Sequence, residues 1–252
     1  MSSIAIASVF LGCSFGAALI GMILHEKLPG HHLQGNSLEV VKLSVGLIAS
    51  MSALVLSLLI ASASNSYNQQ KNELNALAAN IVLLDRTLEF YGSDAKAARD
   101  RLRDLVRQTH DRIWSPEGVR PEVLASMETQ SSVRANVEQL LSLSPQTDLQ
   151  RLMQGRAIQE SDNIAQSRLL IIDQLGSAIS GPFIMVLIVW TCMLFTGFGL
   201  LARNLTVAFA MFGSALTAAG AIFLLLELSD PYHGLMQISD EPLRNAMIQI
   251  DH

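Results

Sequence analysis

Four long apolar segments constrain this chain more than any other feature of its sequence. A helix needs roughly 20 apolar residues to cross the hydrocarbon core of a bilayer, where only helices and closed barrels satisfy the backbone. The segments 3–24, 43–64, 179–201 and 205–226 meet that length. The first segment lacks the basic start and the small-residue cleavage site of a signal peptide, so a removed leader is the weaker alternative. We therefore expect four transmembrane helices.

Most charged residues lie between the second and third apolar segments. Half of the 252 residues are hydrophobic, 15% are charged, and the mean hydropathy of +0.36 is high for a soluble domain. A large charged region without cysteine is easier to leave in the cytoplasm than to translocate. We expect a transmembrane hairpin over 1–64, a cytoplasmic helical region over 65–178, a second hairpin over 179–229 and a cytoplasmic tail over 230–252. Both termini would then be cytoplasmic.

A heptad-type pattern follows the second apolar segment. Apolar residues recur there at alternating spacings of three and four, which is typical of a helix that buries one stripe. The stripe consists of Leu74, Leu77, Ile81, Leu84 and Leu88. Because no Pro or Gly lies between Gly46 and Gly92, we expect one helix of about 50 residues, roughly 75 Å long, that Gly92 ends. The stripe could be buried within one chain or between subunits, and the sequence leaves both alternatives open.

The remaining polar region also has helical patterns. We expect a helix that Ser93 or Asp94 caps and that runs to about Trp114, a shorter helix near 131–143, and a last helix over about 147–177. No stretch alternates polar and apolar residues with a period of two over any length. The sequence therefore predicts an all-α fold.

Two further patterns predict packing at the ends of the chain. Gly12 and Gly16, four residues apart and continued near Gly21, are typical of close contact between membrane helices. The tail is weakly amphipathic and is expected to pack back on the cytoplasmic helices. Its apolar residues are Leu235, Ile238, Leu243, Met247 and Ile250.

The segment HEKLPGHH, residues 25–32, raises the question of a metal site. The zinc-protease motif needs a second His four residues after the first, on one helix face, with the Glu as base. Pro29 occupies that position and ends a helix. A polar turn between two spans explains the segment better, so we expect no bound metal. The disfavoured metal set is His25, Glu26, His31 and His32.

Other motifs that carry chemistry are missing from the sequence. It contains no phosphate-binding glycine loop, no nucleophile elbow and no Cys-x-x-Cys pair. The net charge of −5 argues against a nucleic-acid surface. We expect neither an enzyme nor a cofactor nor a nucleic-acid partner.

One face of the second span carries only small side chains. At 100° per residue its six members fall within about 80° of one another, whereas Leu47, Leu54 and Leu58 lie on other faces. The members are Gly46, Ser50, Ala53, Ser57, Ala61 and Ser64. Lys42 and Lys71 continue the face at its two ends, where they would concentrate anions at the mouths of a pore. Because small residues also let membrane helices approach closely, a packing seam is the alternative.

Several motifs occur in a recognisable order around the four spans. They are LPGHH at 28–32, LLDRTLEFYG at 83–92 with Arg99, LSLSPQTDLQ at 141–150, SRLLIIDQ at 167–174 and LSDPYHGLMQISDEPLRNA at 228–246. Together they resemble the bestrophin-like family of bacterial membrane proteins, from about residue 10 to residue 249. One departure is Ala202-Arg203, where the family has a proline-containing turn.

The resemblance implies a definite architecture and activity. Bestrophins are pentameric anion channels with four spans per subunit, a helical cytoplasmic region between the second and third spans, and a pore lined by the second span. We therefore expect an oligomeric, pentameric channel of the bacterial inner membrane, permeable to small anions if it conducts. Its partners would be the lipid bilayer and copies of itself. The alternative is a membrane-anchored helical interaction protein without a pore.

Overall fold

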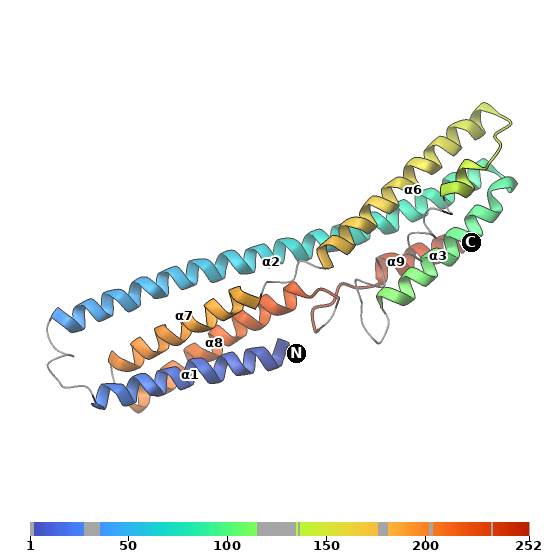
Figure 1. The fold of residues 1–252 in the computed structure, drawn as a ribbon. Helices are drawn as coiled ribbons and strands as arrows, with labels where there is room; N and C mark the ends of the chain where they lie inside the picture. The colour runs from blue at the N-terminus through green and yellow to red at the C-terminus, as the bar shows by residue number, and fades with distance from the viewer. Residues whose placement is uncertain are drawn as a thin grey trace. The chain divides into compact units, whose positions relative to one another are not determined.

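A computed structural model shows the chain as a set of long helices (Figure 1). It describes residues 3–27, 36–114, 135, 137–175, 181–201, 204–232 and 234–251. The helices are α1 (Ser3–Lys27), α2 (Asn36–Tyr91), α3 (Lys96–Ile113), α6 (Asp148–Leu175), α7 (Gly181–Leu201), α8 (Leu205–Ser229) and α9 (Glu241–Ile250), with a short 3-10 helix, η2 (Ser93–Ala95). Within these described ranges no residue is in a strand, and the all-α prediction is confirmed.

Four of these helices are long and apolar enough to cross a membrane. They are α1, α2 from Glu39 onward, α7 from Phe183 onward, and α8. These are the four segments that the sequence predicted. The contacts divide the chain into a membrane unit, residues 1–65 and 179–229, and a polar unit, residues 66–178 and 230–252. Helix α2 contributes its first part to the membrane unit and its later part to the polar unit.

The closest packing in the membrane unit joins α1 to α7. A side chain added at Gly21 would overlap the backbone oxygen of Thr196, and one added at Gly199 would overlap that of Ala18. The predicted close contact at Gly12 and Gly16 is wrong within one chain, because an added Cβ would meet nothing within 4 Å at either residue. The contact lies further along α1 at Gly21, where the predicted pattern continues and is confirmed, and α7 supplies a glycine of its own, Gly199.

The long second helix is confirmed, and so is the residue that ends it. Helix α2 has 56 residues, or about 84 Å at 1.5 Å per residue. Gly92 follows it with a positive φ of 111°, and its N–H donates to the carbonyl of Glu89 at 3.1 Å. Side chains with a Cβ rarely adopt this backbone conformation, so glycine suits the position.

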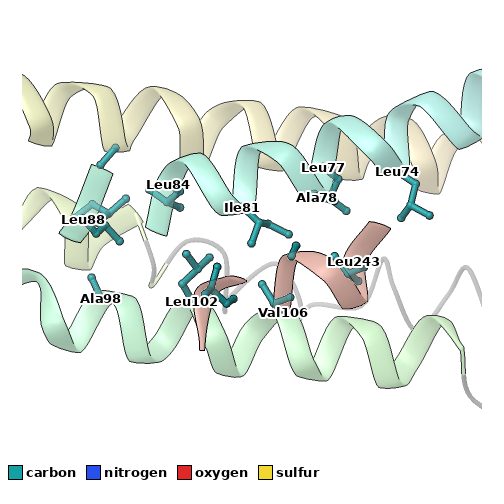
Figure 2. Close-up of a cluster of buried hydrophobic side chains, with 14 of the residues drawn as sticks. Leu74, Leu77, Ala78, Ile81, Leu84, Leu88, Ala98, Leu102, Val106 and Leu243 are labelled. Carbon is teal, nitrogen blue, oxygen red and sulfur yellow. The ribbon is translucent and has the colours of Figure 1, made fainter. Parts of the chain in front are cut away.

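The core of the polar unit forms around the later part of α2 (Figure 2). The five heptad-type residues of α2 are between 0% and 4% exposed. Leu102 and Val106 of α3 and Leu243 of α9 face them in the same cluster. Ala157 and Ile171 bring α6 into this core. The stripe is thus buried within one chain.

Some local predictions differ from the structure. Neither Ser93 nor Asp94 caps α3, because η2 occupies these positions and Ala95 precedes the helix without a side-chain cap. Leu235 is 75% exposed, so its predicted packing is wrong, although Ile238, Leu243 and Ile250 are buried. The tail helix begins only at Glu241, which leaves Leu235 in the preceding turn. Of the helix predicted near 131–143, residues 137–141 are described as helical, and most of the earlier part lies outside the described residues.

Candidate functional site

The membrane part of α2 has one narrow face that packs on the other spans. Val45 and Ala63 are buried on it, and Gly197 of α7 lies directly against Val45. Partly buried residues extend this face: Val41, Ile48, Ala49, Val55, Leu56, Leu59 and Ile60. At 100° per residue they cover roughly 140° of the helix. Helix α2 is the least buried of the four spans, so most of its circumference is not covered by its own chain.

The small-residue face of α2 is part of this uncovered surface. Gly46, Ser50, Ala53, Ser57 and Ala61 are all exposed. The sixth residue of the face, Ser64, is half-buried. The Ser50 hydroxyl donates to the Gly46 carbonyl at 3.0 Å, so its oxygen keeps lone pairs for another partner. The face is therefore available to water, lipid or a second subunit.

A third face of α2 carries large apolar side chains. Leu47, Leu54 and Leu58 are more than half exposed, and they are centred about 90° from the small-residue face. Such side chains suit lipid or a neighbouring helix, whereas small and hydroxylated ones suit water or close packing. The two uncovered faces of α2 thus have different chemistry.

The two lysines predicted at the ends of the small-residue face are exposed. Lys42 lies one turn before Gly46 on α2, and Lys71 lies on the part of α2 that belongs to the polar unit. An exposed ammonium can concentrate anions within about 10 Å at moderate salt.

His25, the first residue of the disfavoured metal set, holds two helix ends together. Its Nδ1 lies 2.6 Å from the carbonyl oxygen of Leu200, so the end of α1 is joined to the end of α7. His31 and His32 lie outside the described residues. Within the part of the chain that the structure describes, no three His, Cys, Asp or Glu residues are placed to hold a metal ion.

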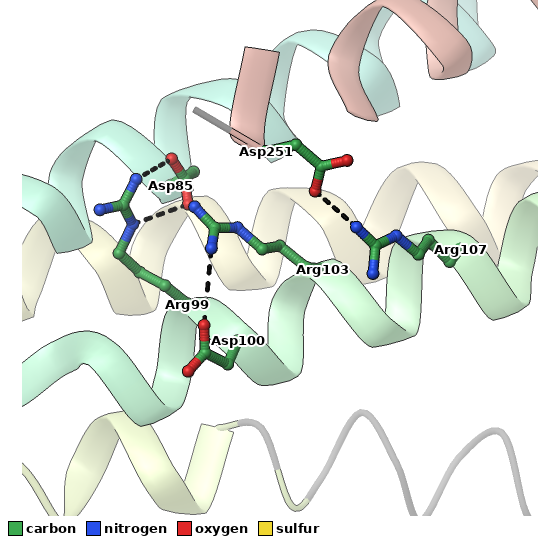
Figure 3. A network of polar contacts seen from close by, with 6 residues as sticks. All are labelled: Asp85, Arg99, Asp100, Arg103, Arg107 and Asp251. Atoms are coloured by element: carbon green, nitrogen blue, oxygen red, sulfur yellow. Dashed lines mark hydrogen bonds and ion pairs between the residues drawn. The ribbon is translucent and has the colours of Figure 1, made fainter. Parts of the chain in front are cut away.

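A buried ion pair joins α2 to α3 in the polar unit (Figure 3). Arg99 donates to both carboxylate oxygens of Asp85, from Nε at 2.9 Å and from Nη2 at 2.7 Å. The Asp85 side chain is only 4% exposed. The hydrogen bond to Asp85 raises the pKa of Arg99, so the guanidinium stays charged. Asp85 belongs to the LLDRTLEFYG motif, and Arg99 was named together with that motif in the sequence. In this structure the two residues hold α2 and α3 together.

The tail is held on α3 by one ion pair, one further polar contact and one aromatic group. Arg107 donates to Asp251 at 2.7 Å (Figure 3), and His110 Nε2 lies 3.4 Å from an Asp240 oxygen. Trp114 stacks on the His110 ring, with ring centroids 5.4 Å apart, and its indole N–H donates to the Ile238 carbonyl at 3.3 Å. These contacts explain why the tail packs back on the polar unit.

Tyr232 lies at the start of the tail with its ring edge against Trp114. Burial raises the pKa of the Tyr232 phenol to about 12. Its hydroxyl has no hydrogen-bond partner among the described residues. The phenol therefore stays neutral over the physiological range and contributes mainly through apolar contact.

Two glutamines at the start of α6 hold the turn before it, and the sequence did not single them out. The Gln150 amide donates to the Tyr91 carbonyl at 3.2 Å, and its oxygen accepts from the backbone N–H of Gln146 at 2.8 Å. Gln154 donates to the carbonyls of Leu140 and Leu143, both at 2.9 Å. Gln150 ends the LSLSPQTDLQ motif, which was the available signal, but its partner Tyr91 is distant in sequence.

Four candidate spans with a helical polar unit between the second and third define the class of protein as a helical multi-span membrane protein. Within that class, the family model for the bestrophin-like domain matches residues 12–243. The chain belongs to the bestrophin-like family.

Solved structures agree with this assignment at the level of fold. A variant of a bacterial bestrophin homologue from Klebsiella pneumoniae superposes with a TM-score of 0.76 at 11% identity, over 97% of each chain. Another structure of the homologue from that organism gives a TM-score of 0.74 at 12% identity, over 96% of each chain. A structure described as a membrane protein gives 0.74 at 13%, also over 96% of each chain. The comparison with curated proteins gave no match.

Proposed function

We propose that the chain assembles into a homo-oligomeric ion channel, pentameric in the bacterial inner membrane, with a pore lined by the small-residue face of α2. The observation that carries the proposal is the exposure of five residues of this face, from Gly46 to Ala61, in a span that its own chain leaves largely uncovered. A helix of this kind can surround an aqueous axis only together with copies of itself. Membership of the bestrophin-like family supports the same proposal.

The proposed pore conducts small anions. Ser50 and Ser57 offer hydroxyl groups along the path, and Lys42 and Lys71 add positive charge at its ends. We place the polar unit and both termini in the cytoplasm, because a large charged region is costly to translocate. We propose no enzymatic activity and no bound cofactor.

Two measurements test this function together. The mass of the purified protein in detergent gives the number of subunits, with five expected, and chloride flux into liposomes tests conduction. Lys42→Glu should then shift selectivity away from anions, more at low salt than at high salt, because screening shortens the reach of the charge. An oligomer without flux would exclude the channel.

The competing function is a membrane-anchored interaction protein. Large apolar side chains exposed on the polar unit favour it, since Phe90, Leu149 and Leu152 are suited to a protein partner. In this case the small-residue face of α2 would be a dry packing seam. The liposome measurement separates the two functions, because an anchored interaction protein conducts nothing.

A further inference from the structure

Two glycines of α7 face different neighbours in the membrane unit. At 100° per residue Gly197 and Gly199 lie about 200° apart, so they are on opposite sides of α7. A Cβ added at Gly199 would overlap the backbone oxygen of Ala18 on α1, whereas one added at Gly197 would lie 2.5 Å from Cγ2 of Val45 on α2. Helix α7 therefore packs on α1 with one side and on α2 with the other.

The contact between Gly197 and Val45 leaves no room for a further side chain. Carbon atoms in contact stay about 3.5 to 4.0 Å apart, so a methyl group at Gly197 would need about 1 Å more space. Val45 is 6% exposed, and a β-branched side chain keeps one strongly preferred rotamer in a helix, so it does not turn away. Helix α7 cannot retreat, because the α1 backbone lies behind it at Gly199. The space must therefore come from a movement of α2.

Helix α2 has room for this movement within its own chain, which covers it less than any other span. Val45 lies about 120° from the centre of the small-residue face. A movement of α2 directly away from α7 thus also carries that face toward the proposed pore axis, by about half of the displacement. Gly46, the first residue of the face, follows Val45 directly, and Lys42 lies three residues before it. The movement would therefore narrow the pore at its Lys42 end.

We propose that Gly197 is a positioning residue that sets the width of the pore at its Lys42 end. The proposal rests on the proposed channel and adds the residue that holds its lining helix in place. Because Gly197 has no side chain, α2 lies close against α7, and the small-residue faces of the subunits stay apart around the axis. Val45 is the side chain through which Gly197 acts.

Chloride flux into liposomes by Gly197→Ala tests this role. The added methyl group should lower the flux about threefold, because conduction depends on pore diameter, while the oligomer keeps its mass in detergent. Gly12→Ala makes the same change in helix propensity where an added Cβ meets nothing within 4 Å. It is the matched control and should keep the flux of the wild type. A Gly197→Ala oligomer that conducts like the wild type would overturn the proposal and leave the proposed function standing.

A second substitution separates the position of α2 from a general packing defect. Val45→Ala removes both methyl groups that the added Cβ would meet, and the Cβ of Val45 itself is 3.7 Å away, at an ordinary contact distance. Val45→Ala alone should not lower the flux. The double variant with Gly197→Ala should recover the flux of the wild type, and also its assembly if Gly197→Ala alone loses it.

The outcomes of the double variant decide between the two accounts. A double variant that assembles but keeps the low flux of Gly197→Ala, or that does not assemble, would overturn the role of Gly197. A wild-type oligomer without flux would overturn the channel and this role with it.

Discussion

Arg99 of α3 forms two parallel hydrogen bonds with the buried carboxylate of Asp85 on α2, at 2.9 and 2.7 Å. A buried charge is tolerated only with such a partner, because the protein interior solvates it poorly. We expect Arg99→Ala to lower the free energy of unfolding by about 3 to 5 kcal/mol, measured by thermal unfolding in detergent. Arg99→Lys should recover part of the loss, since an ammonium lacks the planar fork.

The matched control for this pair is Arg151→Ala. Arg151 contacts Asp148 at 2.9 Å, but both side chains are largely exposed. Exposed pairs contribute roughly 0 to 1 kcal/mol. Equal effects of Arg99→Ala and Arg151→Ala would contradict a structural role for the buried pair.

The heptad-type stripe of α2 makes the core of the polar unit sensitive to charge. Ile81 is 4% exposed in the cluster with Leu102 and Leu243. Ile81→Asp should destabilise the protein by several kcal/mol and expose the polar unit to proteases, because an unpaired carboxylate would be buried there. Leu83→Asp, two residues later on a more exposed part of the helix, should cost much less. If Ile81→Asp melts like the wild type, this side of α2 is not buried in solution.

The contact of α1 with α7 depends on Gly21. Because an added side chain would overlap the Thr196 backbone, Gly21→Leu should separate the two helices and lower the melting temperature clearly. Gly12→Leu on the same helix has free space around its Cβ and should leave the melting temperature of the isolated subunit almost unchanged. The reverse order of the two effects would show that α1 is rotated relative to this packing.

Because the Tyr232 phenol is buried, we expect the protein to lose stability in alkaline solution. Its pKa is raised from 10.0 to about 12, so the unfolded chain releases this proton first as the pH rises. The free energy of unfolding should fall between pH 10 and pH 12, by roughly 2.5 kcal/mol from this group, and stay level below pH 10. Tyr232→Phe should reduce that slope without loss of stability at pH 8, since the hydroxyl has no described partner. Parallel pH profiles for the two proteins would contradict the burial of the phenol.

The sequence predicted those features that depend on local patterns. Apolar length predicted the four spans, spacings of three and four predicted the stripe from Leu74 to Leu88, and Gly92 predicted the end of α2. Each of these three features is determined within a single segment and needs no partner from elsewhere in the chain. The family resemblance, confirmed by the match over 12–243, added the order of the elements.

The features that the sequence missed depend on partners far along the chain. Gln150 matters because the Tyr91 carbonyl lies beside it, and Gly199 matters because Gly21 lies across from it. Neither partner can be read from local spacing. The prediction that Ser93 or Asp94 caps α3 is wrong for a different reason. The tight turn after Gly92 continues as a 3-10 helix through both residues. The pore-lining role of the small-residue face stays a prediction, because it concerns neighbouring subunits.

Thiol accessibility at Ser57 tests the central claim, that the small-residue face of α2 lines an aqueous path. In the background without Cys13 and Cys192, Ser57→Cys and Leu54→Cys place one thiol on each of the two uncovered faces of α2. A small charged thiol reagent reacts with the thiolate, which forms only where water reaches. The account predicts rapid reaction at Ser57→Cys in membranes, with loss of flux, and much slower reaction at Leu54→Cys. A Ser57→Cys protein that assembles normally and reacts no faster than Leu54→Cys would contradict a pore along this face.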